Sequence, residues 1–236
     1  MKPNGFTLIE CLIGLALSLL VVCSSLEFFS SAEKHYFDLK DKEESGQDVL
    51  AALDKIRIDV LHGGQGLVLP MSLGLVDGVA AAADGLLLSR AEATIILAES
   101  VAAGSVRIPA AATGDFKPGR DVCVWDEDWG EVRSVAAVEP GAIILSAPLE
   151  FDYGAGTGSF SQIETVRIIW DEAKGQLRRQ ANLSSPQPLL ENVETAAFEV
   201  EESSSLCRVR LKLNRQGESP YELSIFLKNP ALARSR

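Results

Sequence analysis

A single carboxylate near the start of the chain lies where a charged side chain is costly. Glu10 opens an apolar run that extends to Leu26, and no charged residue occurs between Glu10 and Glu27. A carboxylate at the centre of a membrane-spanning helix costs on the order of 2.5–3.5 kcal/mol, so it usually persists where another group pairs with it. The residue types therefore predict that another group pairs with Glu10.

A second group of side chains with coordinating chemistry lies near the middle of the chain. Asp126, Asp128 and Glu131 place carboxylate oxygens close together between two predicted strands. Oxygen ligands at alternate positions can hold Ca²⁺, but the full calcium-loop pattern is missing. We therefore expect a solvated hairpin turn, with these three residues as weak metal candidates.

Two cysteines of the C-terminal part could form a disulfide. Cys123 and Cys207 both lie in strand-like runs. A bridge between them would close a long loop and stabilise the fold by roughly 4–5 kcal/mol in the chain-entropy model. Two separate buried thiols are the alternative, because the sequence does not give the Cα separation that decides between them.

The sequence offers no constellation for catalysis. The chain has only two His residues, neither in a metal-ligand spacing, and no Gly-x-Ser-x-Gly elbow. The glycines from Gly154 to Gly158 lack the strand-to-helix setting of a phosphate-binding loop. We predict that the protein is not an enzyme and needs no cofactor.

One long helix is predicted to carry the N-terminal residues. The apolar run continues without proline into a charged stretch, and its first half is long enough to span a bilayer. Apolar residues then follow at helical spacing: Val49, Ala52, Leu53, Ile56 and Val60. Glycines after His62 end the pattern. The predicted helix runs from Phe6 to about Leu61.

Short runs with β-strand character follow the helix. Strands are predicted at residues 94–98, 105–108, 122–125, 131–138, 142–145, 165–170, 206–213 and 221–227. In the clearest of them Cys207, Val209, Leu211 and Leu213 face inward, and Arg208, Arg210 and Lys212 face water. Residues 221–227 are the expected hairpin partner. The predicted fold class is α+β, a long N-terminal α-helix packed on a mainly antiparallel β-rich C-terminal domain.

The three tryptophans leave two interpretations open. Trp125, Trp129 and Trp170 are expected to pack the sheet, because aromatic side chains dominate cores. An exposed aromatic binding face is the alternative.

The N-terminal residues together resemble the class III signal of type IV pilins and type II secretion pseudopilins. In that family Gly-Phe-Thr-Leu-Ile-Glu, residues 5–10 here, is the processing motif. The resemblance implies that a prepilin peptidase cuts between Gly5 and Phe6 and that Phe6 is N-methylated. It also implies that Glu10 meets the Phe6 amine of a neighbouring subunit, where the two charges offset each other's desolvation cost.

Other N-terminal signals fit these residues less well. A secretory signal needs a basic n-region and a small-x-small cleavage site, whereas only Lys2 and no Ala-x-Ala occur here. A lipoprotein signal would acylate Cys23, but large residues precede it. A plain transmembrane anchor explains the length of the run and leaves Gly5, Phe6 and Glu10 unexplained.

On looser patterns, the body resembles W-type minor pilins and J-type minor pseudopilins. Residues 53–60 look like the junction of helix and body, and residues 175–179 with 188–194 look like a shared C-terminal module. Residues 119–154 look like an inserted β-module. The resemblance implies a leader at 1–5, a membrane and assembly segment at 6–29, an amphipathic helical half at 30–62 and an exported β-rich domain at 63–236, with the inserted module at about 100–160.

The resemblance also implies a function and a location. The chain would be a minor pilin that helps to initiate or cap type IV pilus assembly, held by one span in the inner (cytoplasmic) membrane, with its C-terminal domain exported to the periplasm or cell surface. Its partners would be prepilin peptidase, other minor and major pilins or pseudopilins and an inner-membrane assembly platform. A minor pseudopilin of a type II secretion system remains an alternative, as does an adhesive or DNA-capturing module at the pilus tip.

The charge of the chain bears on the nucleic-acid alternative. A net charge of −11 argues against a generic nucleic-acid binder, which would carry a basic face. Four arginines could still form a local basic patch: Arg178, Arg179, Arg208 and Arg210.

Overall fold

The chain divides into two compact units, Met1–Ala51 and Ala52–Arg236. A computed structural model describes residues 8–214 and 219–235. Helix α1 (Leu8–His62) forms the described part of the first unit, and its last turns belong to the second. The helix ends where glycine was predicted to end it, and Gly64 has a φ of 74°, a backbone conformation that glycine adopts readily. The predicted start at Phe6 lies outside the described residues.

The last turns of α1 bury one face. Ala52, Leu53, Ile56 and Val60 are at most 8% exposed, and Val49, which precedes them in the predicted stripe, is also buried. Leu61, on another side of the helix, is 42% exposed. The predicted stripe is therefore confirmed by the burial of all its residues.

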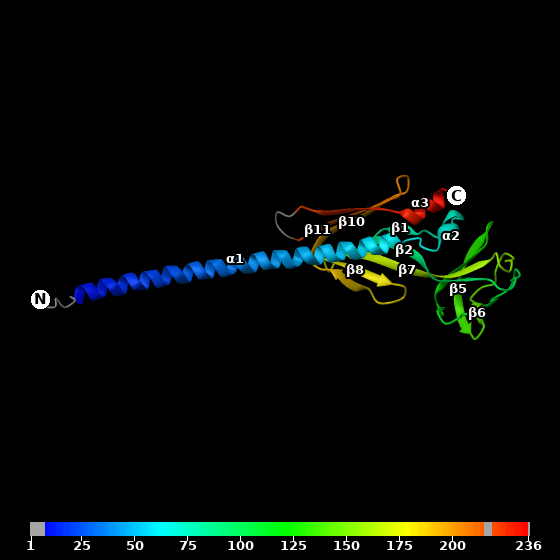
Figure 1. Ribbon diagram of the computed structural model, residues 1–236, viewed down its shortest axis with the longest axis horizontal. Helices are drawn as coiled ribbons and strands as arrows, with labels where there is room; N and C mark the ends of the chain where they lie inside the picture. Colours follow the sequence, from blue (N-terminus) through cyan, green and yellow to red (C-terminus); the bar gives the residue numbers. More distant parts are fainter. Residues whose placement is uncertain (1–7, 215–218, 236) are drawn as a thin grey trace. The chain divides into compact units, whose positions relative to one another are not determined.

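A nine-stranded sheet is built around the long strand β7 (Ser159–Asp171) (Figure 1). β7 pairs antiparallel with β2 (Gly85–Ile96) over nearly its whole length. On its other side, its first residues pair with β4 (Asp121–Trp125) and its last residues with β8 (Gln176–Ala181). The remaining strands of this sheet are β1 (Val79–Ala82), β3 (Arg107–Pro109), β5 (Gly130–Glu139), β6 (Ala142–Leu145) and β9 (Gln187–Leu190).

One hydrophobic cluster forms between Leu97 and Phe160, around strands β3, β4, β5 and β6. Ile108, Phe160 and Tyr153 are at most 1% exposed within it. The rings of Phe116 and Phe160 pack with centroids 5.1 Å apart. The first residues of β7 thus pack in this cluster, together with buried residues of the loops that connect the strands.

A separate three-stranded antiparallel sheet has the order β10 (Val193–Glu201), β11 (Leu206–Leu213), β12 (Tyr221–Phe226). The predicted hairpin pairing of the last two strands is confirmed. The predicted alternation is confirmed too: the four inward-facing residues of β11 are buried, Arg208 and Arg210 are exposed, and Lys212 is half-buried. Two short helices, α2 (Val68–Ser72) and α3 (Lys228–Arg234), lie against each other (Figure 1).

The predicted α+β class is confirmed, but several strands were missed. β2 begins at Gly85 rather than Thr94, and β1, β8, β9 and β10 had not been predicted. Residues 85–93 and 195–197 contain Ala, Leu and Glu, which do not favour strands by themselves. Pairing with a neighbouring strand decided these segments instead.

Candidate functional site

The N-terminal part of α1 exposes its large apolar side chains. Eleven of them are 54–82% exposed: Leu8, Ile9, Leu12, Ile13, Leu15, Leu17, Leu19, Leu20, Val21, Val22 and Leu26. Of the described helices, α1 is the one long and apolar enough to cross a membrane. Because apolar surface of this extent is unfavourable in water, the segment is compatible with a single-pass membrane anchor.

The polar side chains on this segment suit an apolar surrounding. The hydroxyl of Ser18 donates to the carbonyl of Leu15 at 2.9 Å, and that of Ser25 donates to the carbonyl of Val21 at 2.8 Å. Hydroxyls bonded to their own helix present no unsatisfied group to lipid. Glu10 lies in the first turn of α1 and is exposed. The predicted cleavage and methylation positions, Gly5 and Phe6, lie outside the described residues.

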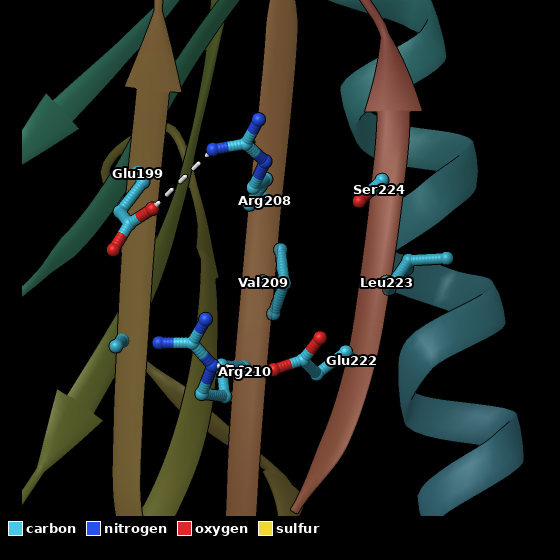
Figure 2. A pocket seen from close by; sticks show the side chains of 8 residues that line it. Glu199, Arg208, Val209, Arg210, Glu222, Leu223 and Ser224 are labelled. Atoms are coloured by element: carbon cyan, nitrogen blue, oxygen red, sulfur yellow. Dashed lines mark hydrogen bonds and ion pairs between the residues drawn. The ribbon is translucent and has the colours of Figure 1, made fainter.

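Two arginines of the suggested basic patch lie on the outer face of the three-stranded sheet, where Figure 2 shows them between carboxylates. Arg210 donates from Nε to Glu222 at 2.7 Å. Arg208 donates to Glu201 at 3.3 Å, and its Nη1 lies 4.0 Å from an oxygen of Glu199. The hollow among these side chains measures about 20 Å³, room for one water molecule. These cross-strand ion pairs neutralise the face.

The other two arginines of the suggested patch lie elsewhere, on β8. Arg179 binds the buried carboxylate of Asp59, and Arg178 donates to Asp171 at 3.4 Å and to the carbonyl of Pro186 at 2.7 Å. Each of the four arginines is thus paired with a carboxylate, which a nucleic-acid phosphate would have to displace. The four arginines therefore do not form a basic patch.

The acidic turn does not gather its carboxylates around one point. Asp126 Oδ1 accepts the backbone N–H groups of Asp128 and Trp129, at 3.0 and 3.1 Å. Glu131 is 5% exposed and pairs with Arg133. No group of three or more His, Cys, Asp or Glu suited to a metal occurs among the residues for which coordinates are described. Two of the weak metal candidates Asp126, Asp128 and Glu131 thus have structural partners, and the acidic residues lie at the predicted hairpin turn between β4 and β5.

Cys123 and Cys207 are free thiols, so the disulfide, one of the two alternatives left open for them, is wrong. They lie in different sheets, Cys123 on β4 and Cys207 on β11, and both are fully buried. Burial, with a smaller contribution from the Glu131 carboxylate, raises the pKa of Cys123 to about 12. Burial raises the pKa of Cys207 to about 11. The alternative of two separate buried thiols describes them.

The tryptophans divide between the two interpretations. Trp125 is buried at 7% exposure and packs in a cluster with Cys123, and Trp170 is half-buried. Trp129 differs, since it is 42% exposed and stacks on Phe151. The expectation that all three pack the sheet is therefore wrong for Trp129.

No protein-family model matches the chain, and no curated protein matches it in sequence. The residues described above are therefore the basis for assigning a function.

Proposed function

We propose that this chain is a minor pilin, a structural subunit that helps to initiate or cap assembly of a type IV pilus after removal of its leader by prepilin peptidase. The role is one of association and involves no catalysis. Its partners in this proposal are prepilin peptidase, other minor and major pilins and an assembly platform in the inner membrane.

One observation carries the proposal. In the sequence, Gly5-Phe6-Thr-Leu-Ile-Glu10 is followed at once by an apolar run, and in helix α1, described from Leu8, the large apolar side chains are exposed as far as Leu26. An ordinary anchor requires the apolar length alone. The added junction and carboxylate are the features that a processed, laterally associating subunit needs.

In the proposed mechanism, the apolar segment of one subunit packs against those of its neighbours. After cleavage the new amine at Phe6 would be a cation four residues before Glu10 in the sequence, and Glu10 is an anion in the first turn of α1. In a medium of low dielectric each charge reduces the desolvation cost of the other. Pairing between subunits would thus set their axial register.

A minor pseudopilin of a type II secretion system is the second candidate, because it would share the same processing motif and anchor. Deleting the gene distinguishes the two: loss of surface pili supports the pilin, whereas loss of exported enzymes with normal pili supports the pseudopilin. A DNA-capturing tip module is less well supported, because its arginines are engaged by carboxylates.

The proposal is tested by the intact mass and the N-terminal peptide mass of the protein from cells with and without prepilin peptidase. We expect peptidase-dependent loss of residues 1–5 and a methyl group on Phe6. A matched pair of variants sharpens the test: Gly5→Val should block cleavage, whereas Gly14→Ala, at a position where a methyl group meets no atom within 4 Å, should not. An uncleaved chain, or a lipid attached at Cys23, would overturn the proposal.

A further inference from the structure

Two exposed aromatic rings stack on each other at the surface of the second unit. Trp129, in the turn between β4 and β5, stacks on Phe151, which follows β6. The ring centroids are 5.9 Å apart and the planes differ by 20°. The two residues are 42% and 39% exposed. We call them the aromatic platform. Large aromatic side chains usually lie in cores or at binding surfaces, so an exposed stacked pair indicates recognition.

The Trp129 side of the platform is fixed by its own turn. Asp126 Oδ1 accepts the backbone N–H of Trp129 at 3.1 Å, and the Asp126 N–H donates to the Trp129 carbonyl at 3.0 Å. The indole N–H of Trp129 donates to the carbonyl of Asp152 at 3.4 Å. The indole is therefore tied both to its own turn and to the segment that carries Phe151.

The Phe151 side is held by the buried carboxylate of Glu131. Glu131 accepts the backbone N–H of Glu150 at 3.0 Å and the hydroxyl of Tyr153 at 3.0 Å, on either side of Phe151. The ion pair with Arg133 neutralises this buried charge. Both rings are thus ordered before any partner arrives, which lowers the entropic cost of binding.

The charge around the platform identifies its partner. Exposed carboxylates flank the rings in sequence on both sides: Glu127, Asp128, Glu150 and Asp152. Arg133 is engaged by Glu131 and Glu150 and so is not offered to a ligand. Glu150 already pairs with Arg133 and Asp152 accepts the backbone N–H of Ala103 at 2.8 Å, so Glu127 and Asp128, in the turn that carries Trp129, supply the negative charge. Negative charge next to aromatic rings favours a cation, because the face of an aromatic ring also carries negative charge. Anionic ligands, nucleic acids among them, would be repelled.

We propose that the aromatic platform binds an arginine or lysine side chain presented by a partner protein, with the cation over the rings and its donors toward the flanking carboxylates. Arginine suits the site better than lysine, because its planar guanidinium can stack on a ring while its N–H groups reach a carboxylate. The proposal does not depend on the assembly role of the N-terminal helix.

The test uses the full-length protein in an uncharged detergent and a fluorescein-labelled tetra-arginine peptide with capped ends, followed by fluorescence anisotropy at physiological salt. Trp129→Ser and Phe151→Ser should each raise the dissociation constant about fivefold or more, because the rings are lost while the charge is unchanged. Phe226→Ser is the matched control, since it removes another exposed aromatic ring, 56% exposed, from the three-stranded sheet. This control should leave affinity within about twofold.

Charge variants provide a second arm that does not alter the rings. Glu127→Gln should weaken peptide binding, whereas Glu172→Gln, an exposed carboxylate in the turn after β7, should not. Equal affinity of Trp129→Ser, Phe151→Ser and the unsubstituted protein would show general attraction to an acidic protein and would overturn the proposal. Binding of neutral maltotetraose without binding of the peptide would overturn it as well.

Discussion

Arg179 of β8 donates two hydrogen bonds to the buried carboxylate of Asp59 in the last turns of α1. The Nε–Oδ2 distance is 2.6 Å and the Nη2–Oδ1 distance is 3.1 Å. Hydrogen bonding to Asp59 raises the pKa of Arg179 above its usual value. Lys55, one turn earlier on α1, lies 3.5 Å from the same carboxylate. This contact joins the last turns of α1 to β8 of the nine-stranded sheet, although the two residues are 120 positions apart in the sequence.

Removal of this carboxylate should destabilise the body strongly. Asp59→Ala leaves the Arg179 guanidinium without its partner in a partly buried site, and breaking a buried pair in this way costs about 3–5 kcal/mol. Lys55→Ala is the control, because the Lys55 ammonium is half-exposed and 3.5 Å from the same carboxylate, so its loss should cost at most about 1 kcal/mol. Urea unfolding of the detergent-solubilised protein, followed by tryptophan fluorescence, measures both. Equal losses of stability in the two variants would contradict the importance of the Asp59–Arg179 contact.

Gly85 should tolerate no side chain, because β2 begins there against β7. A Cβ on Gly85 would lie 1.7 Å from the carbonyl oxygen of Ile168, a backbone atom that cannot move aside without breaking the pairing. We expect Gly85→Ala to cost about 3 kcal/mol or more in unfolding free energy. Gly114→Ala, where the added methyl group meets no atom within 4 Å, should change stability little. The same urea titration compares them, and a stable Gly85→Ala protein would mean that the strands pair differently.

The buried thiols should make the body less stable in alkali. The pKa of Cys123 rises from 9.0 to about 12 on folding, and that of Cys207 rises from 9.0 to about 11. Below pH 9 both thiols stay protonated in the folded and in the unfolded chain, so their contribution to the free energy of unfolding is fully present. Above pH 9 the unfolded chain loses these protons first, and stability falls by about 1.4 kcal/mol per pH unit for each thiol until its folded pKa is reached.

Cysteine substitution isolates this effect. Urea unfolding at pH 8 and pH 10, under reducing conditions, should show a smaller loss of stability between the two pH values in Cys123→Ala and Cys207→Ala than in the unsubstituted protein. Because each variant is compared with itself at two pH values, the cavity that alanine leaves cancels. An unchanged pH dependence would show that the thiols ionise equally in both states.

Glu10 should be required for assembly and dispensable for membrane insertion. In Glu10→Ala the anion proposed to pair with the Phe6 amine is absent. We expect normal leader removal and membrane insertion, but at least about tenfold less of the subunit in sheared pili. The reason is that loss of one partner from a charge pair in a medium of low dielectric costs more than about 1.4 kcal/mol. Glu27→Ala, at the other end of the apolar run, is the control. Immunoblots of membrane and pilus fractions measure both, and normal incorporation of Glu10→Ala would contradict the role given to Glu10.

The elements whose pattern is local could be predicted from the sequence. The apolar stripe that ends at Val60, the glycine stop after His62 and the alternation around Val209 each repeat with the period of one element, so a short window contains the whole signal. The same holds for the apolar segment that begins at Leu8. Its apolar character and its length follow from the sequence and need no tertiary contact.

Contacts between residues far apart in the sequence could not be predicted and became known from the fold. The burial of Asp59 could not be predicted from its place on a charged helix, because Arg179 lies on a strand whose polar sequence gave no strand signal. The separation of Cys123 from Cys207 depends on two different sheets, and the stacking of Trp129 on Phe151 depends on Glu131 holding the Phe151 segment beside it. A local sequence pattern determines the period and the polarity of a helix or strand. Which strands pair depends on contacts between residues far apart in the sequence, and these contacts form only in the packed core.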